Sequence, residues 1–300
     1  MSDAFLAIVN PSAGGGRCGK LAKTALEKLR AAGVELDITE TGGPGDAARL
    51  ARIAYAQGWR QFIAVGGDGT AYEIVNGLFP EAEAGGKPVL GFLPLGTGNS
   101  FLRDFTSNGA EHAREAIVAR SRKSSDVLCL QHSGGKLYFI NLLSVGFTAD
   151  VTAAANRRFK GLGELGYLFG VLQCLARLRR RAFPLRADGD AEFDQRRCLF
   201  LSFNNSRFTG GKMMIAPQAS IGDGLIEYVR WGPIGRIGLL RNLPTLFDGT
   251  HIGHPLASRR GVRRIEFALE APVDVMIDGE VLTLKCQSVE VLPGVLDVLV

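Results

Sequence analysis

The chain has 300 residues, enough for two domains of ordinary size that each bury a hydrophobic core. Hydrophobic residues make up 46% and charged residues 22%, near soluble averages, whereas the 39 glycines are about twice the usual share of ~7%. This glycine excess indicates functional loops. The net charge of +5 favours anionic partners such as nucleotides, lipid head groups or nucleic acid, and does not choose among them.

The sequence also bears on where the protein works. The N-terminus lacks the basic start and apolar run of a secretion signal, and the longest charge-free apolar stretch, residues 165–176, is shorter than the ~20 residues of a bilayer-spanning helix. The five cysteines are odd in number and contain no C-x-x-C pair, which is typical of a reduced cytosol. We therefore expect a cytoplasmic protein whose contact with membranes is peripheral.

The first half of the chain alternates between apolar strand-like runs and amphipathic helical runs. This alternation predicts an α/β domain with a parallel sheet over residues 1–125. The strand-like runs are residues 5–9, 35–38, 62–65 and 89–93, and the helical runs are residues 20–30, 46–57, 71–79 and 110–119.

Beyond residue 125 the pattern changes to many short β-rich runs, which predicts an antiparallel β-sandwich over residues 126–290. Two helical insertions interrupt this half, around residues 161–181 and 234–247, and residues 121–125 are the expected linker between the domains. The β-rich runs are residues 127–131, 137–143, 198–204, 225–229, 265–269 and 273–277. The first insertion ends in a basic cluster, which is either a solvated helix end or a membrane contact: Arg177, Arg179, Arg180 and Arg181.

Three glycine-rich loops follow strands of the first half, at residues 10–17, 66–70 and 96–99. Each alone would also suit a tight turn between a strand and a helix. Together they favour a polyphosphate cradle, because glycines let backbone N–H groups approach one anion at helix N-termini. The first loop nearly matches the Walker pattern G-x-x-x-x-G-K-[ST]. Leu21 replaces its magnesium-binding hydroxyl, so a Walker loop is excluded.

Asp68, in the second loop, indicates a metal ion. A carboxylate inside a phosphate-binding loop repels the phosphates unless a divalent cation lies between them, which predicts Mg²⁺. The alternative is that Asp68 only caps the helix that opens at Thr70. Capping alone does not account for the paired glycines before it.

These loops, together with motifs of the second half, resemble the diacylglycerol kinase catalytic-domain family, which includes bacterial lipid kinases, sphingosine kinases and ceramide kinases. The Gly-Gly-Asp-Gly loop alone is shared with NAD kinases and phosphofructokinases, and the later motifs make the resemblance specific. The resemblance implies an α/β N-terminal domain with a parallel sheet, NAD kinase/phosphofructokinase-like, followed by an antiparallel β-sandwich domain for the lipid. It also implies that residues 291–300 return to the first domain. The motifs are Asn10–Gly14, Gly66–Thr70 with Glu73 and Asn76–Gly77, Gly96–Asn99, Asp126, Phe139–Asn141, Gly146–Phe147, Asn204–Asn205, Gly210–Lys212, Ala216–Pro217, Gly222–Gly224 and Asp278–Glu280.

The resemblance also implies residue roles. Asp68 and Asp126 would hold catalytic Mg²⁺, partly through water, and Asp278 would be the general base with Glu280 beside it. Asp223 with the carbonyls of Ser220 and Leu225 matches a structural metal site of bacterial members. The residues expected to line the nucleotide are Asn10, Gly14, Thr41, Gly67, Gly69, Thr70, Thr97 and Asn99.

The function expected from these features is that of an ATP-dependent lipid kinase in phospholipid biosynthesis, acting on diacylglycerol or a related lipid alcohol at the membrane surface. Asp278-Gly279 would equally suit a plain hairpin turn. Two rivals stay open: a soluble-metabolite kinase of the NAD-kinase kind, and a non-catalytic nucleotide-binding module. The three aspartates Asp68, Asp126 and Asp278 argue against the second rival, and the absence of an aromatic–basic motif argues against nucleic acid. No obligatory protein partner is evident. The choice of ATP or GTP and a homodimer both stay open.

Overall fold

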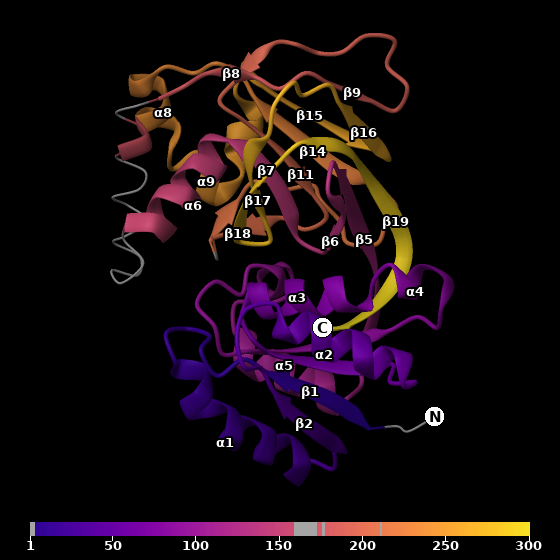
Figure 1. The fold of residues 1–300 in the computed structure, drawn as a ribbon. Coiled ribbons are helices and arrows are strands. Elements are labelled where there is room, and N and C mark those ends of the chain that lie inside the picture. Colours follow the sequence, from indigo (N-terminus) through magenta and orange to yellow (C-terminus); the bar gives the residue numbers. More distant parts are fainter. Residues whose placement is uncertain (1–3, 159–172, 176–177, 211) are drawn as a thin grey trace.

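The computed structural model describes residues 4–158, 173–175, 178–210 and 212–300. The first domain is a parallel sheet in the order β2-β1-β3-β4, with helices on both faces (Figure 1). All six residues of β3 are buried, as expected for a parallel strand covered on both sides. The strands are β1 Phe5–Val9, β2 Leu36–Glu40, β3 Gln61–Gly66 and β4 Val89–Pro94, and the helices are α1 Arg17–Ala31, α2 Asp46–Ala56, α3 Asp68–Leu78, α4 Glu81–Ala84, η1 Phe101–Asp104 and α5 Gly109–Val118.

The second domain is a β-sandwich whose two sheets enclose a hydrophobic core of their own. One sheet has the antiparallel order β15-β14-β11-β7-β17-β18, and the facing strands are β9, β16, β19, β5 and β6. The predicted fold class is therefore confirmed. The strands are β5 Arg122–His132, β6 Gly135–Phe139, β7 Leu142–Gly146, β9 Leu185–Ala187, β11 Phe200–Asn204, β14 Ile226–Trp231, β15 Ala257–Val262, β16 Arg264–Phe267, β17 Val273–Ile277, β18 Glu280–Leu284 and β19 Cys286–Leu299.

Short helices cover the outer face of the six-stranded sheet and form a separate apolar layer around Trp231 and Phe200. They are α6 Phe147–Arg158, α8 Arg236–Asn242, α9 Thr245–Asp248 and η3 Thr250–Gly253. Two-stranded ribbons complete the domain, made of β8 Arg181–Ala182 with β10 Arg197–Cys198 and of β12 Phe208–Thr209 with β13 Met213–Met214. Much of the first predicted insertion, residues 161–172 and 176–177, lies outside the described residues. No helix in the described part of the chain is long and apolar enough to cross a membrane.

Two long strands, β5 and β19, run through both domains. The expected linker at residues 121–125 is wrong, because β5 begins at Arg122 and its first residues pair with the end of β19. The same end of β19 also pairs in parallel with β4, through Asp297 and Val89. Figure 1 shows β19, in yellow, descending from the second domain to the edge of the first sheet. Each domain is therefore tied to the other by β-sheet hydrogen bonds and not by a flexible connection.

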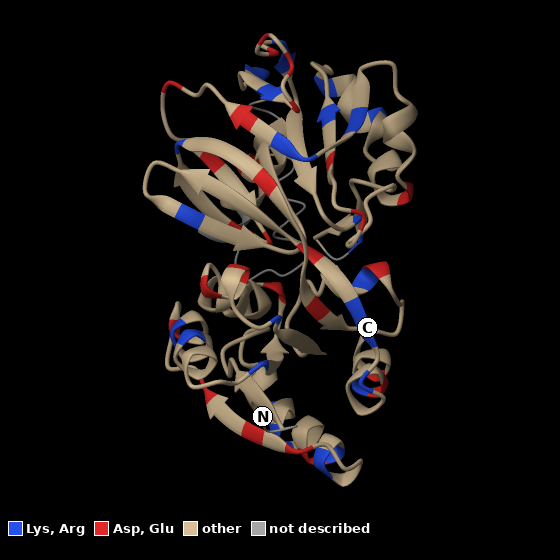
Figure 2. Cartoon of the chain, turned by 90° about the vertical axis from the view of Figure 1, so that its right-hand side faces the viewer, with Lys and Arg blue, Asp and Glu red and all other residues tan. Residues whose placement is uncertain are grey.

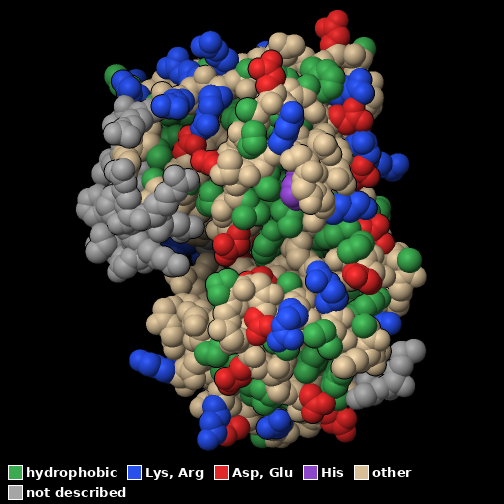
Figure 3. All heavy atoms as spheres, in the orientation of Figure 1, with side chains coloured by type: hydrophobic (Ala, Val, Ile, Leu, Met, Phe, Trp, Pro, Cys, Tyr) green, Lys and Arg blue, Asp and Glu red, His purple; other side chains and the backbone are tan. Residues whose placement is uncertain are grey.

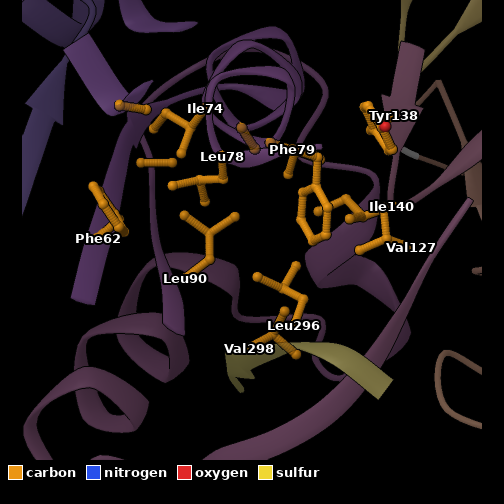
Figure 4. Close-up of a cluster of buried hydrophobic side chains, with 14 of the residues drawn as sticks. Phe62, Ile74, Leu78, Phe79, Leu90, Val127, Tyr138, Ile140, Leu296 and Val298 are labelled. Atoms are coloured by element: carbon orange, nitrogen blue, oxygen red, sulfur yellow. The ribbon is translucent and has the colours of Figure 1, made fainter. Parts of the chain in front are cut away.

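The hydrophobic core of the first domain continues into the second (Figure 4). Leu296 and Val298 of β19 pack in one cluster with residues from α3, β3 and β4 and with Ile140 beyond β6. The rings of Phe79 and Tyr138 lie 5.3 Å apart within it. A continuous core of this kind opposes free rotation of one domain against the other.

Candidate active site

The three glycine loops converge at the carboxyl ends of β1, β3 and β4. Asn10 of the first loop donates from Nδ2 to Thr70 Oγ1 at 3.3 Å, and Gly96 N–H donates to the carbonyl of Gly66 at 2.8 Å. A Cβ atom at Gly96 would lie 2.5 Å from the Cα of Gly67, so the second and third loops touch backbone to backbone. Side chains at these positions would separate the loops, which explains the glycines.

The helices that follow the first two loops begin directly after a glycine and have no side-chain cap. Gly16, in the left-handed region with φ 88°, precedes α1, and Gly67 precedes α3. Neither N-cap residue offers a side-chain hydrogen bond to its helix. The first N–H groups of α1 are used within the loop, since Arg17, Cys18 and Gly19 donate to the carbonyls of Gly14, Ala13 and Pro11. The positive ends of the two helix dipoles, at the loops, remain an arrangement that attracts phosphate.

Asp68 begins α3 and joins the second loop to the third. Both of its carboxylate oxygens accept the Ser100 N–H at 2.9 Å, and a Cβ atom at Gly98 would lie 2.8 Å from its Oδ2. Because its carboxylate bonds the third loop, the capping interpretation of Asp68 is not supported. Burial raises the pKa of Asp68 above its usual range. Its negative charge is therefore poorly solvated, as expected where a cation is to be received.

Asp278 approaches from the second domain, at the tip of the β17–β18 hairpin. Asp278 and Gly279 both have positive φ, 47° and 92°, and form the two-residue turn between Ile277 and Glu280. The Asp278 side chain is only 3% exposed. Burial, with a contribution from the charge of Asp68, raises its pKa to about 7. The turn and the buried acid thus coexist, and Asp278 lies close enough to sense Asp68.

Three backbone N–H groups hold the Asp278 carboxylate. Oδ2 accepts from Ile140 at 3.1 Å, while Oδ1 accepts from Asn141 at 3.1 Å and from Leu142 at 2.9 Å. These donors lie where the run predicted as one strand over residues 137–143 divides into β6 and β7. The break frees N–H groups that an unbroken strand would give to its neighbours. In return, the backbone N–H of Asp278 donates to the carbonyl of Leu142.

Glu280 and Tyr72 complete the meeting of the two domains. A Cβ atom at Gly69 would lie 2.9 Å from Glu280 Oε1, so this exposed carboxylate rests on the second glycine loop. Tyr72, one turn into α3, packs into the core of the second domain. Its pKa is raised by burial first and then by the charges of Asp278 and Glu280. The structure therefore brings Asp68, Asp278 and Glu280 together around the start of α3.

The remaining residues expected at the nucleotide lie on the same loop surface. Thr41 follows β2 and donates its N–H to the Val9 carbonyl, beside the first loop. Thr97 is exposed, and Asn99 has a positive φ of 47° with its amide directed at the carbonyls of Pro94 and Gly96. The first loop also reaches the third, since a Cβ at Gly14 would lie 3.0 Å from the Leu95 carbonyl.

Asp126 is placed in a different group from Asp68. Its buried carboxylate accepts the N–H of Gly224 at 2.7 Å and of Gly294 at 2.8 Å, which fastens β5 to the bulge of β19. Across the described residues, no three acidic, histidine or cysteine side chains gather closely enough to hold a metal ion. The structure thus does not combine Asp68, Asp126 and Asp278 into one ligand cluster.

The expected structural metal site lies in the exposed loop next to Asp126. Asp223 accepts the Leu225 N–H at 3.0 Å in a local turn, and Ser220 is exposed nearby in the chain. Burial first, then the charges of Asp126 and Glu227, raises the pKa of Asp223. Cation binding would relieve this concentration of negative charge.

Several residues that shape the site carried no predicted role. Glu73 accepts the N–H groups of Gly45 at 2.9 Å and Ala47 at 3.1 Å, and so fixes the start of α2. Asn76 bonds both backbone groups of Tyr138, accepting its N–H at 2.9 Å and donating to its carbonyl at 2.7 Å. Glu73 and Asn76 are three residues apart on one helix, and this spacing is a signal from which a shared role near the site could have been predicted. The contact of Ser100 with Asp68 depends on tertiary structure and left no sequence signal.

Comparison with known proteins agrees with this architecture. Residues 4–130 match the model of the diacylglycerol kinase catalytic domain, and residues 141–300 match that of the YegS C-terminal NAD kinase beta sandwich-like domain. A diacylglycerol kinase of Mycobacterium tuberculosis is 30% identical over 297 residues, which cover 98% of this chain and 94% of the relative. A "Probable lipid kinase YegS-like" of Pseudomonas fluorescens is 34% identical over 261 residues, with 86% and 81% covered.

Two crystal structures from Bacillus anthracis strain Sterne have similar folds. The first superposes with a TM-score of 0.78 at 25% identity and covers 99% of this chain and 95% of the other. The second, of a diacylglycerol kinase, superposes with a TM-score of 0.70 at 23% identity and covers 99% and 96%. At 23% identity, the similarity to the second structure is evidence for the fold alone.

An α/β domain with three glycine loops, facing a β-sandwich that contributes a buried carboxylate, defines a two-domain kinase of the lipid-kinase class. The chain belongs to the diacylglycerol kinase catalytic-domain family. The predicted resemblance is therefore confirmed.

Proposed function

We propose that this protein transfers the γ-phosphate of ATP, with Mg²⁺, to the hydroxyl of diacylglycerol or a related lipid alcohol. One observation carries the proposal: a buried carboxylate of the second domain, Asp278, is held beside the glycine loops and Asp68 of the first. A phosphoryl donor on the loops and an acceptor alcohol on the sandwich would meet there. The name of the Mycobacterium tuberculosis relative supports diacylglycerol as the first acceptor to test.

Asp278 is the proposed general base. A carboxylate offers about four acceptor positions, and three are taken by backbone N–H groups, which leaves one on Oδ2. The hydroxyl oxygen of the lipid bonds to the γ-phosphorus while the bond from that phosphorus to the β–γ bridging oxygen breaks, and ADP leaves with its electron pair. The hydroxyl proton passes to Asp278 late in this loose transfer. Glu280, beside Gly69, is proposed to orient the acceptor.

The loops are proposed to bind the nucleotide, with the N-termini of α1 and α3 directed at its phosphates. The residues present fit a divalent cation, because the carboxylates of Asp68 and Asp278 are desolvated and neither forms an ion pair with lysine or arginine among the described residues. Mg²⁺ typically takes one or two carboxylates and the phosphate oxygens of its substrate. Asp68 would hold it, and the ion would neutralise charge on the transferring group.

Asp126 is proposed to act on the metal only indirectly, since its buried carboxylate is bonded to Gly224 and Gly294 and belongs to no ligand cluster with Asp68 among the described residues. In that role it keeps β5, the Asp223 loop and β19 in register. Asp223, with the carbonyls of Ser220 and Leu225, remains the proposed structural cation site.

Labelled ATP and a panel of acceptors test the activity directly. Purified protein is incubated with diacylglycerol, phosphatidylglycerol and a sphingoid base in mixed micelles, and separately with NAD, and the labelled product is identified. We expect label on a lipid, most of all on diacylglycerol. Label on NAD alone would establish the soluble-metabolite kinase instead, and label on no acceptor would favour the non-catalytic module.

The metal assignment is tested with Asp68→Ala, which removes the carboxylate together with its bond to the Ser100 N–H, so the fold of the variant is checked alongside. Turnover should fall to background, as it should for the wild type in excess chelator, because the phosphate charge is no longer neutralised. Thr106→Ala, which removes a hydroxyl from an exposed loop beyond η1, is the matched control and should keep wild-type turnover. Wild-type activity in Asp68→Ala would rule out the assignment.

A further inference from the structure

Large apolar side chains gather at one place on the surface of the second domain. Among the described residues, half of the exposed large hydrophobics lie between residues 236 and 256, and the others are scattered over the first domain. The three most exposed of all are Ile237 at 68%, Phe247 at 51% and Leu240 at 50%. Single exposed apolar residues need no explanation, whereas a cluster indicates an interaction surface. We refer to Ile237, Leu240, Arg241 and Phe247, on α8 and α9, as the α8–α9 surface.

The exposure follows from how α8 and α9 are anchored. Leu239 of α8 and Leu246 of α9 are buried in the apolar layer over the six-stranded sheet, so the opposite sides of these short helices face outward. Ile237 and Leu240 are three residues apart and therefore neighbours on one helix face. Leu239 and Leu246 thus pack α8 and α9 against the domain, whereas the exposed Ile237, Leu240 and Phe247 do not belong to the buried core.

Basic side chains border this apolar cluster. Arg241 is exposed on α8, and Arg179 and Arg180 are exposed just before β8. A Cβ atom at Gly235 would lie 3.6 Å from a guanidinium nitrogen of Arg180, which places that charge at the start of α8. The acid on these helices is Asp248, whose carboxylate accepts from the N–H and hydroxyl of Thr250. The border is therefore net positive.

Of the four arginines in the predicted basic cluster, two are described and exposed in the structure. Arg181 is half-buried and pairs with Asp150 of α6, so it is not available to a partner, and Arg177 lies outside the described residues. Arg179 and Arg180 are the described members that face outward. Figure 3 shows basic side chains, in blue, along the upper edge of the molecule. Figure 2, seen from the right-hand side of Figure 1, shows that strands of the second domain also carry lysine and arginine on that other side.

The α8–α9 surface belongs to the same outer layer of the second domain as α6. Helix α6, in the same outer layer, packs against β17 and β18, the strands whose turn carries Asp278. Figure 1 shows α6, α8 and α9 along one side of the sandwich, above the junction with α3. A planar partner resting on α8 and α9 would thus lie on the side of the sandwich that α6 covers.

We propose that the α8–α9 surface docks the enzyme on anionic phospholipid bilayers, with Ile237, Leu240 and Phe247 entering the interface and Arg179, Arg180 and Arg241 binding head groups. Apolar residues ringed by arginines match an interface that is apolar below and negatively charged above, as in amphipathic surface helices. This inference rests on the proposed lipid kinase activity and names how its insoluble substrate is reached. Two helices as short as α8 and α9 would bind the membrane weakly and reversibly, so the enzyme could leave one lipid and reach the next.

Vesicle co-sedimentation tests the docking without any kinase assay. The probes are vesicles of phosphatidylcholine and of an equimolar mixture of phosphatidylcholine and phosphatidylglycerol. Wild-type protein should bind the mixed vesicles, with binding that falls as salt rises. Ile237→Ser/Leu240→Ser/Phe247→Ser should lose binding, and each of Arg179→Gln, Arg180→Gln and Arg241→Gln should weaken it about fivefold. Ile38→Ser/Ile53→Ser/Val118→Ser, at exposed apolar positions of the first domain, is the matched control and should bind as the wild type does.

A kinase assay in two formats separates the docking from the activity. The triple serine variant should lose phosphorylation of diacylglycerol in vesicles and keep that of a short-chain diacylglycerol dissolved in water. Wild type that binds vesicles without phosphorylating either form would overturn the proposed activity and leave the docking intact.

Three results would overturn the docking. They are wild-type protein that ignores both vesicle types, a triple variant that binds as wild type does, and a triple variant that merely converts a dimer to a monomer in sedimentation without lipid. Should the triple variant misfold, Leu240→Trp replaces it: its emission should shift to the blue on mixed vesicles, and that of Ile53→Trp should not.

Discussion

At the scale of single residues, the site depends on carboxylates whose surroundings disfavour their charge. Burial first, and then the charge of Asp68, raises the pKa of Asp278 to about 7, although the three backbone N–H groups that hold its carboxylate favour the ionised form. A base with a pKa near the working pH is efficient, because it is both ionised and able to bind a proton. The environment thus converts an ordinary hairpin aspartate into a suitable proton acceptor.

Asp278→Asn removes the proton acceptor and keeps the size of the side chain. We expect kcat per folded molecule to fall about 10²–10⁴-fold, the usual contribution of a positioned base, with nucleotide affinity nearly unchanged. In the wild type, kcat/KM should fall about tenfold per pH unit below pH ~7 and level off above it, because protonated Asp278 cannot accept the hydroxyl proton. The measurement is a pH series of steady-state rates with a folding check at each pH.

The pH profile of kcat/KM for Asp278→Asn should lack this ionisation, since asparagine at position 278 does not titrate. Near-normal kcat in Asp278→Asn would move the base to Glu280 or to a bound water. It would also favour the interpretation of Asp278-Gly279 as a turn and nothing more. A wild-type profile that stays flat through pH ~7 would contradict the same assignment.

At the scale of elements, close backbone approach sets where α3 lies and hence where Asp68 lies. Helices α2 and α3 pack so tightly at Gly77 that a Cβ atom there would lie 2.2 Å from the Ala48 carbonyl oxygen and 2.8 Å from the Ala51 Cβ. Both helices would have to separate to admit it. In the Asn-Gly pair of this helix, Asn76 thus makes the contact between the domains, and Gly77 permits the contact between the helices.

Gly77→Ala should destabilise the protein although alanine is the better helix former. The gain in helix propensity is about 1 kcal/mol, and overpacking against backbone costs about 1–3 kcal/mol. We expect a lower urea midpoint and a lower kcat, because α3 carries Asp68. Gly109→Ala, which would make only an ordinary contact with Pro94 at 3.9 Å, should be neutral or stabilising. Equal midpoints for the two variants would contradict the tight-packing account.

At the scale of the whole molecule, the two domains are fixed relative to each other by sheet, core and hydrogen bonds. Strands β5 and β19 belong to both, and Asn76 of α3 bonds the backbone of Tyr138 in β6. On another side, Arg207 donates its N–H to the carboxylate of Asp104 at the end of η1. These contacts hold the Asp278 hairpin against the glycine loops.

Asn76→Ala tests this coupling. It leaves the half-buried N–H and carbonyl of Tyr138 without their partner, which should cost about 1–3 kcal/mol for each unpaired group. It should lower kcat as well, because α3, which begins with Asp68, is no longer bonded to β6, which leads to the N–H groups that hold Asp278. Tyr138→Phe is the control, since it removes the hydroxyl, which bonds Glu83, and keeps the ring in the core and the backbone bonds to Asn76. Urea unfolding and steady-state rates give both readouts, and a variant that loses stability while keeping full kcat would confine Asn76 to a structural role.

The sequence by itself determined the features that depend on local pattern. Alternating apolar runs placed all four strands of the first sheet, and glycine spacing identified three loops that converge, since parallel strands end at one edge. Motif order along the chain was sufficient to assign the family. Each of these signals lies within a short window of residues, where steric and hydrogen-bonding preferences act directly.

Only the tertiary structure decided which side chains meet. It turned the expected linker into strand β5, broke the run over residues 137–143 to supply the N–H groups for Asp278, and fastened Asp126 to Gly224 and Gly294 instead of Asp68. It also left α8 and α9 with outward apolar side chains. The physical reason is the same throughout: a contact between residues far apart in the chain depends on sheet pairing and core packing, and no local pattern of residues records it.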